Sequence, residues 1–198
     1  MQSLRIPTMG MMDTLKVIEK MEADGIFGRY AIGGAFAASY YVEPTLTEDL
    51  DILLSFEAEA SQTKSGLITL APIFLYLQER GYSDFRKGGI VIEGWPVEFI
   101  PVANDLDAEA LAEARDVHID EPNKSIRTRV LSPEHVVAIC LRVGRAKDFI
   151  RITQFLDANV LDMSRLHQIL DRHGLTDAWR SFCFRNGISD PYAPYSKA

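Results

Sequence analysis

The segment 32–53, with the sequence IGGAFAASYYVEPTLTEDLDIL, restricts the possible folds of this chain more than any other part. An apolar run ends there at Gly33-Gly34, a short apolar stretch follows, and a second apolar run carries Asp49 and Asp51. This order predicts a strand, a glycine turn, a short buried helix and a second strand. A chain that alternates strands and helices in this way builds a sheet with helices packed on it.

The rest of the first half continues this mixture of strands and helices. An amphipathic period predicts a helix over 13–23. Further helices are expected over 72–80, where Gly81 ends the helix, and over the short acidic stretch 107–115. Apolar runs bounded by turn residues predict strands over 26–32, 49–56, 90–93, 97–102 and 126–131, with 90–93 and 97–102 forming a hairpin. The acidic stretch from Asp105 to Asp120 is interpreted as a solvated face.

The second half indicates helices only. Ser132-Pro133-Glu134 combines a capping serine, a proline at the first helical position and an acid in the first turn. Helices are expected to 142 and over 145–158, 163–172 and 177–184, with Asp162 and Thr176 as caps. The predicted fold class is therefore α/β (α+β): a mixed sheet with flanking helices over 1–131, followed by a C-terminal helical bundle over 132–198.

Composition excludes several classes of protein. With 198 residues, 47% of them hydrophobic and 25% charged, the chain is expected to bury a core, and no apolar run is long enough to span a membrane. The formal net charge of −7 argues against bulk nucleic-acid binding. Cys140 and Cys183 form no Cys-x-x-Cys pair, and no signal peptide is evident, so reduced thiols and a cytoplasmic location are expected.

Three carboxylates make the strongest candidate for chemistry. Asp49 and Asp51 lie two residues apart on a predicted strand, so both side chains point to the same face. Glu98 is a single acid among apolar neighbours on a later strand, and it would join them if the two strands are adjacent. Like charges held together need a cation between them, and oxygen ligands suit Mg²⁺. Alone, each acid also fits a solvent-facing strand edge.

The order of these features resembles the nucleotidyltransferase superfamily: Gly33-Gly34, a spacer, Asp49-Leu50-Asp51, and a later strand with Glu98. Within it the chain looks most like the AbiEii-like branch, which includes toxin nucleotidyltransferases. Further residues that carry this resemblance are Ala35, Tyr40, the stretch 47–52 (TEDLDI), and a helical segment over 131–156 that contains Arg145, Lys147 and Asp148.

The resemblance implies a nucleotidyltransferase-like sheet and the transfer of a nucleoside monophosphate from a triphosphate such as ATP to an acceptor. Asp49, Asp51 and Glu98 would hold one or two Mg²⁺ ions, or Mn²⁺, and Glu98 could instead act as the base. Among the remaining site residues, Gly33 and Gly34 would cradle the phosphates, and Arg145 and Lys147 would contact the triphosphate or the acceptor. The acceptor itself, a small hydroxylated molecule, a protein or an RNA, stays open.

Three departures from the branch leave the function open. Thr45, Cys140 and Arg151 stand where relatives often carry an arginine, a lysine and an acid respectively. The changes at Cys140 and Arg151 favour a non-catalytic relative that binds a nucleotide or a protein partner. The intact trio of acids favours an enzyme, since three converging carboxylates destabilise a fold that has no metal to bind. A third hypothesis is a toxin with an antitoxin partner. The negative net charge argues against a toxin that acts on RNA, because the protein would repel a large polyanion.

Overall fold

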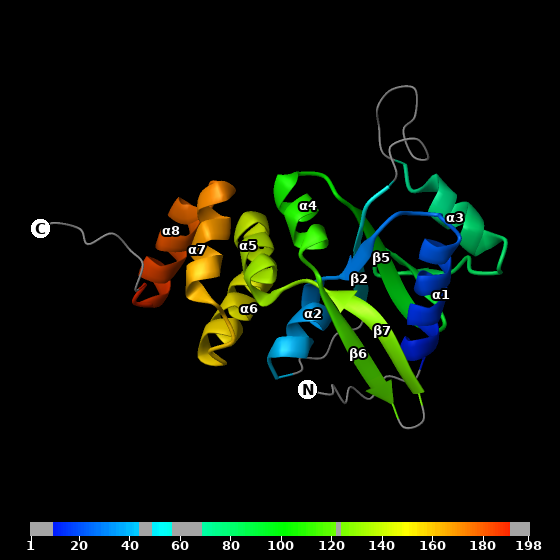
Figure 1. Cartoon of the computed structure of the whole chain (residues 1–198), viewed down its shortest axis with the longest axis horizontal. Helices are drawn as coiled ribbons and strands as arrows, with labels where there is room; N and C mark the ends of the chain where they lie inside the picture. The colour runs from blue at the N-terminus through cyan, green and yellow to red at the C-terminus, as the bar shows by residue number, and fades with distance from the viewer. Residues whose placement is uncertain (1–9, 44–48, 57–68, 122–123, 191–198) are drawn as a thin grey trace, which may run out of the picture. The chain divides into compact units, whose positions relative to one another are not determined.

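The computed structural model describes residues 10–43, 49–56, 69–121 and 124–190. The chain divides into two compact units, with the boundary between Leu131 and Ser132. The first unit contains a sheet and helices, and the second contains helices (Figure 1). That each unit is an independent domain remains a prediction.

The N-terminal unit is built on one sheet. In the described residues its strands are β1 (Tyr30–Ile32), β2 (Leu50–Leu54), β3 (Phe85–Arg86), β4 (Gly89–Ile92), β5 (Trp95–Pro101), β6 (Arg115–Glu121) and β7 (Lys124–Val130). Their order in the sheet is β3-β4-β5-β2-β1-β7-β6. The pairs β2–β5 and β1–β7 are parallel, and the other neighbours are antiparallel. The predicted mixed sheet is confirmed.

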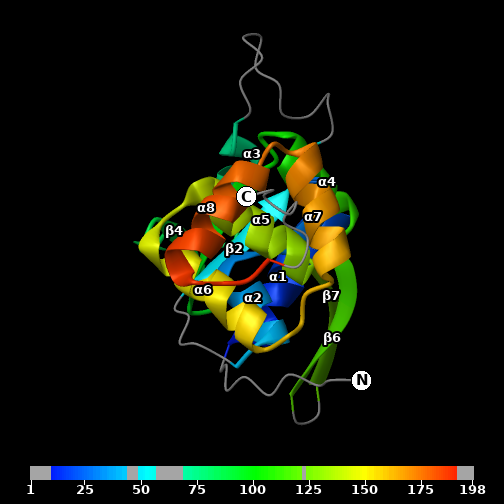
Figure 2. The ribbon, with the colours of Figure 1, turned by 90° about the vertical axis from the view of Figure 1, so that its left-hand side faces the viewer.

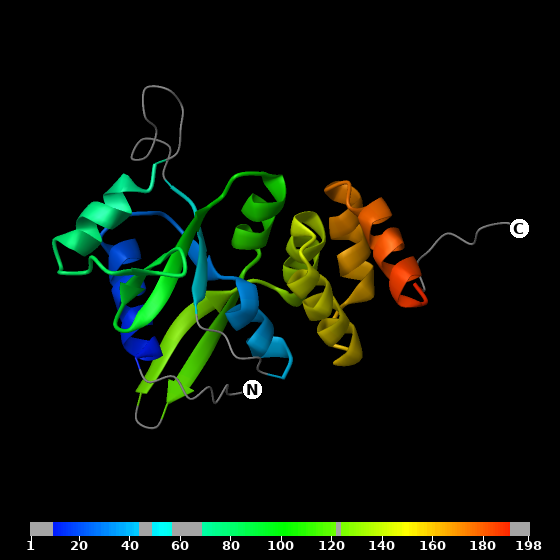
Figure 3. The same cartoon turned by 180° about the vertical axis from the view of Figure 1, so that it is seen from behind.

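The helices of this unit are α1 (Met11–Ala23), α2 (Gly34–Tyr41), α3 (Ala71–Gln78) and α4 (Asp105–Ala112). Contacts place α1 beside β7, and both α2 and α4 beside β2, and Figure 3 shows these elements from behind. Thr14 of α1 donates a hydrogen bond of 2.8 Å from its hydroxyl to the carbonyl of Ile92, which anchors the helix to β4. Helices therefore flank the sheet, as the sequence predicts.

One face of the sheet carries apolar side chains from successive strands. Ile52 of β2 lies opposite Phe99 of β5 and Ile32 of β1, and all three side chains are buried. Because side chains alternate along a strand, the neighbouring residues Asp51 and Glu98 point to the other face. The burial of Ile52 and Phe99 thus determines which way the candidate carboxylates point.

The C-terminal unit is helical throughout its described part. Residues 132–190 form α5 (Pro133–Val143), α6 (Ala146–Asp157), α7 (Met163–Arg172) and α8 (Thr176–Asn186), with no strand among them (Figure 2). Helix α5 contacts each of the other three. Trp179 and Phe182 of α8 stack with ring centroids 5.8 Å apart. The predicted run of helices is confirmed, including Ser132 as the cap of α5.

Strand β6 contradicts the prediction for residues 107–120. Helix α4 ends at Ala112, and Arg115–Glu121 pair with β7 along their whole length. Val117 and Ile119 are buried, so apolar and polar side chains alternate in what we expected to be a solvated acidic face. Pairing with β7 outweighs the low intrinsic strand preference of aspartate here. The short strand β3 was not predicted either.

Two smaller differences concern where elements begin. Strand β1 begins at Tyr30 rather than at residue 26, because Ile26 donates its N–H to the carbonyl of Met21 and closes the end of α1. Thr176 is the first residue of α8, and Leu175 occupies the capping position, so the prediction of Thr176 as a cap is wrong. Within the described parts of the chain, no helix combines the length and the apolar character needed to cross a bilayer.

The capping residues provide a direct test of the helical unit. Asp162 accepts a hydrogen bond of 3.0 Å from the backbone N–H of Arg165 at the start of α7. We expect Asp162→Ala to lower the free energy of unfolding by about 1 kcal/mol, the usual cost of losing such a cap. Thr176→Ala, the matched control, should change it by less than about 0.5 kcal/mol. Chemical denaturation measures both, and equal losses would contradict these cap assignments.

Candidate functional site

The two strands that carry the predicted acids are neighbours. Strand β2 pairs in parallel with β5, and Asp51 lies directly opposite Glu98 in the register. Opposed residues of parallel strands share a face, so the two carboxylates project side by side. Asp49 lies one residue before the first residue of β2. Asp51 and Asp49 are half-buried, whereas Glu98 is exposed, so the acids stand at a surface that a solute can reach.

The glycine pair lies directly against Asp51. The N–H of Gly33 donates a hydrogen bond of 2.8 Å to the backbone carbonyl of Asp51. A Cβ at position 34 would lie 1.6 Å from Oδ2 of Asp51, and Gly34 has a φ of +55°, in the left-handed region. Any other residue at 34 would therefore displace the Asp51 carboxylate. Position 33 is less restricted, because a Cβ there would meet its nearest atom at 3.5 Å.

Helix α2 begins at this glycine pair. Gly33 is its N-cap residue and has no side chain to accept from the first-turn N–H groups. Unsatisfied N–H groups and the positive end of the helix dipole make such a terminus favourable for a phosphate. The structure thus brings together four predicted site residues, Gly33, Gly34, Asp51 and Glu98, with Asp49 adjoining. Their roles in binding remain predictions.

The predicted cations Arg145 and Lys147 lie at the start of α6 in the C-terminal unit. Arg145 donates from Nε and Nη2 to the two carboxylate oxygens of Asp148, at 2.8 and 3.1 Å. Asp148 is buried and also accepts the backbone N–H of Arg145 at 3.1 Å, so its carboxylate caps the start of α6. Arg145 therefore has a structural role in this helix. Lys147 is exposed, and no ion pair engages it in the described chain.

Two of the three departures from the expected pattern, Cys140 and Arg151, lie close together in the C-terminal unit. Burial raises the pKa of the Cys140 thiol to about 11, while Arg151 opposes that rise through its charge and a hydrogen bond. The thiol is therefore neutral near pH 7, and Arg151 supplies the positive charge beside it. Nη1 of Arg151 also lies 3.9 Å from Oδ1 of Asp148. Thr45 lies outside the described residues.

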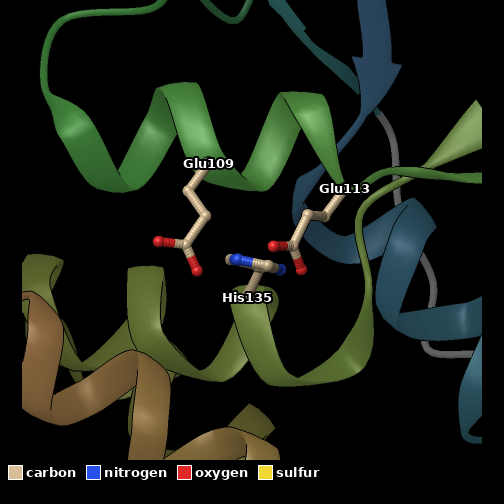
Figure 4. A group of neighbouring side chains, drawn as sticks. All are labelled: Glu109, Glu113 and His135. Carbon is tan, nitrogen blue, oxygen red and sulfur yellow. The ribbon is translucent and has the colours of Figure 1, made fainter.

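Other acidic side chains gather on α4. Glu109 belongs to this helix and Glu113, four residues later, is its C-cap residue; Figure 4 shows both side chains. The same figure labels His135, which belongs to α5 of the C-terminal unit, where its Nδ1 lies 2.8 Å from Oγ of Ser132. Carboxylate oxygens are suitable ligands for Mg²⁺, but two of them on one helix make no site by themselves.

The N-terminal unit has a second polar surface, a charged cavity that the sequence did not predict. A cavity lies between α1, β6 and β7, and its charged lining includes Arg29, Arg127 and Arg129. The spacing of Arg127 and Arg129 is the two-residue period of a strand. This signal could have drawn attention to both residues, but their partners on α1 and β6 were not predictable without the pairing of β6.

Comparison with known proteins gives little further information. No family model matches the chain, and no curated protein matches it. Among solved structures, it is similar to an antigenic nucleotidyltransferase-like protein from Paracoccidioides brasiliensis, at 17% identity and a TM-score of 0.45. That similarity covers 85% of this chain and 93% of the other. Since it is distant, the functional assignment rests on the residues of this chain.

The two glycines make a matched pair for mutation. We expect Gly34→Ala to destabilise the fold by at least about 1–2 kcal/mol, the cost of a left-handed residue with a Cβ, and to displace the Asp51 side chain. Gly33→Ala should cost less than about 1 kcal/mol, since its backbone is extended and its surroundings leave room. Denaturant titration compares the two variants. If both lost the same stability, the close approach of Gly34 to Asp51 would be wrong.

Proposed function

We propose that this chain is a metal-dependent nucleotidyltransferase, which moves a nucleoside monophosphate from a nucleoside triphosphate to a hydroxyl-bearing acceptor. The observation that supports it is the register of β2 and β5, which sets Asp51 beside Glu98. The glycine pair packs against the same aspartate. Phosphoryl transfer needs acids that can hold metal ions and a backbone turn that can accept a phosphate. This site has both in one place.

The donor set fits a hard divalent cation. Asp49, Asp51 and Glu98 offer only carboxylate oxygens, and oxygen ligands are those that Mg²⁺ and Mn²⁺ take. Adjacent carboxylates on one face also repel each other, so a cation would relieve a cost that the fold otherwise carries. We assign one or two Mg²⁺ ions, or Mn²⁺, to these three residues. When bound, such ions neutralise triphosphate charge and stabilise the pyrophosphate leaving group.

The chain's own groups would bind and orient the substrates. The backbone of Gly33 and Gly34, at the start of α2, would face the phosphates, because neither residue has a side chain of its own to hold them off. Glu98 is exposed and would either complete the ligand set or accept the proton of the acceptor hydroxyl. Arg145 and Lys147 as further triphosphate contacts remain part of the proposal, with Arg145 already bound to Asp148.

The proposed reaction forms one phosphorus–oxygen bond and breaks another. The acceptor oxygen attacks the α-phosphorus of the triphosphate, pyrophosphate leaves, and the hydroxyl proton passes to a base or to solvent. With a net charge of −7, the chain has no general attraction for a large polyanion. A small hydroxylated molecule or a protein side chain therefore suits it better than RNA. ATP is the first triphosphate to test.

A second candidate is a non-catalytic member of the same fold that binds a nucleotide or a protein partner. It is favoured by the thiol at Cys140, which supplies no charge, and by the engagement of Arg145 with Asp148. An AbiEii-like toxin paired with an antitoxin protein is a narrower form of the enzyme proposal. Binding and transfer assays separate the non-catalytic candidate from either form of the enzyme, because only an enzyme consumes the triphosphate.

Calorimetry with each of the four common ribonucleoside triphosphates tests the proposal. We expect Mg²⁺-dependent binding of at least one of them by the wild type, and none by Asp51→Asn, which removes a ligand charge but keeps the side-chain shape. Relief of repulsion should leave the stability of Asp51→Asn equal or higher by up to about 1 kcal/mol. Asp84→Asn, at an exposed loop residue, is the control and should bind like the wild type.

The pattern of failures is also informative. If the wild type binds no triphosphate in the presence of Mg²⁺, the result contradicts both the proposal of an enzyme and the proposal of a non-catalytic protein that binds a nucleotide. If a triphosphate binds, but no acceptor offered receives the nucleoside monophosphate and no pyrophosphate is released, the result supports the non-catalytic candidate instead.

A further inference from the structure

A cavity of about 340 Å³ opens on the N-terminal unit between α1, β6 and β7. Every side chain that lines it is polar or charged, and six of them carry charge: Glu19, Glu22, Arg29, Asp116, Arg127 and Arg129. Arg29 directly precedes β1, whereas Gly33 directly follows it. The cavity and the carboxylate site therefore lie toward opposite ends of this strand, and the cavity takes no part in the proposed transfer.

Four of the six charges are already paired with one another. Nη2 of Arg129 donates to both carboxylate oxygens of Glu22, and the two side chains are only 17% and 26% exposed. Nη2 of Arg127 donates to Oδ2 of Asp116 at 3.1 Å in a more exposed pair. These two ion pairs leave their parts of the wall nearly neutral, and the Arg129–Glu22 pair is the more enclosed of the two.

Arg29 has no such carboxylate partner. Its Nε donates to the carbonyl of Leu111 at 3.1 Å and its Nη2 to the carbonyl of Ala114 at 3.5 Å. These carbonyls hold the guanidinium in place without neutralising it, and among the described residues no carboxylate accepts a hydrogen bond from it. The positive charge of Arg29 nevertheless reaches Asp116. The pKa of Asp116 is lowered mainly by the hydrogen bond from Arg127, and the charges of Arg127, Arg129 and Arg29 lower it further.

Glu19 is the other charge left over. It lies three residues before Glu22 on α1, so both side chains point to the same side of the helix. Glu19 is exposed, and in the part of the chain that the structure describes, neither an ion pair nor a hydrogen bond holds its carboxylate. The cavity thus offers one oriented cation and one available anion after its internal pairs are formed.

We propose that this cavity binds a small zwitterion, a free polar amino acid or a dipeptide, with its carboxylate on Arg29 and its ammonium group on Glu19. A simple anion would also meet Glu19, Glu22 and Asp116, and a simple cation would meet three arginines. Only a ligand with both charges complements both leftover groups. The volume of the cavity lies at the lower end of the range of about 300–1,000 Å³ for small-molecule sites. The polar wall of the cavity favours a ligand with a polar side chain over one with an apolar side chain.

Calorimetry of the full chain without Mg²⁺ or nucleotide tests this proposal independently of the transferase. Each common amino acid and a set of dipeptides such as Gly-Gly and Ser-Gly are titrated separately, which distinguishes the two sources of the zwitterion. The tightest ligand is then compared with its primary amide and its N-acetyl derivative. We expect each derivative to bind at least about tenfold more weakly, since each lacks one of the two charges.

Glu19→Gln and Arg29→Gln should weaken the same ligand by at least about tenfold. Glu79→Gln and Arg86→Gln, exposed residues outside the cavity, are the matched controls and should leave binding unchanged. If Arg29→Gln lowers the melting temperature, Arg29→Lys replaces it, because that variant keeps the positive charge and should bind the ligand better than Arg29→Gln. If both Arg29 variants lower the melting temperature, the comparison of Glu19→Gln with the wild type alone decides the test. The proposal is overturned if no zwitterion binds, if the amide and the parent bind equally, or if Glu19→Gln binds like the wild type.

Discussion

The approach of the Gly34 backbone to the Asp51 carboxylate is the constraint on which the candidate site depends. With no Cβ at position 34, the start of α2 can lie against β2, and the hydrogen bond from Gly33 to the Asp51 carbonyl holds it there. A side chain at 34 would need the space that Oδ2 of Asp51 occupies. One contact thus sets the position of an acid and the position of a helix N-terminus together, which any phosphate chemistry at this place requires.

The second acid depends on the register of the sheet. Asp51 faces Glu98 because five consecutive residues of β2 pair with β5, and among these pairs Ile52 and Phe99 are both buried. A slip of one residue would turn Glu98 to the apolar face and expose the apolar residues beside it. The hydrophobic core therefore keeps the carboxylates together, although two negative charges side by side would separate if nothing else held them.

The sequence predicts those parts of the structure that local patterns determine. Three features could be predicted because each depends on only a few consecutive residues: the glycine pair, the spacing of Asp49 and Asp51, and the start of a helix at Ser132. Strand β6 was not predicted because the six acidic residues of the stretch 105–120 suggested a solvated face. The alternation of apolar and polar residues in this strand indicates a structure only once its pairing with β7 is known. The partners of Arg145 and Arg29 were equally hidden, since a side chain's hydrogen bonds depend on tertiary packing.

The position of a bound ion tests the proposed site most directly. A crystal of the wild type grown with Mn²⁺ and a non-hydrolysable triphosphate would locate the metal by its anomalous scattering. We expect the ion to be coordinated by carboxylate oxygens of Asp51 and Glu98 at about 2.0–2.3 Å, with the triphosphate against the Gly33-Gly34 turn. An ion bound elsewhere, for example at Glu109 and Glu113 of α4, or no ion at all beside a bound triphosphate, would contradict the assignment.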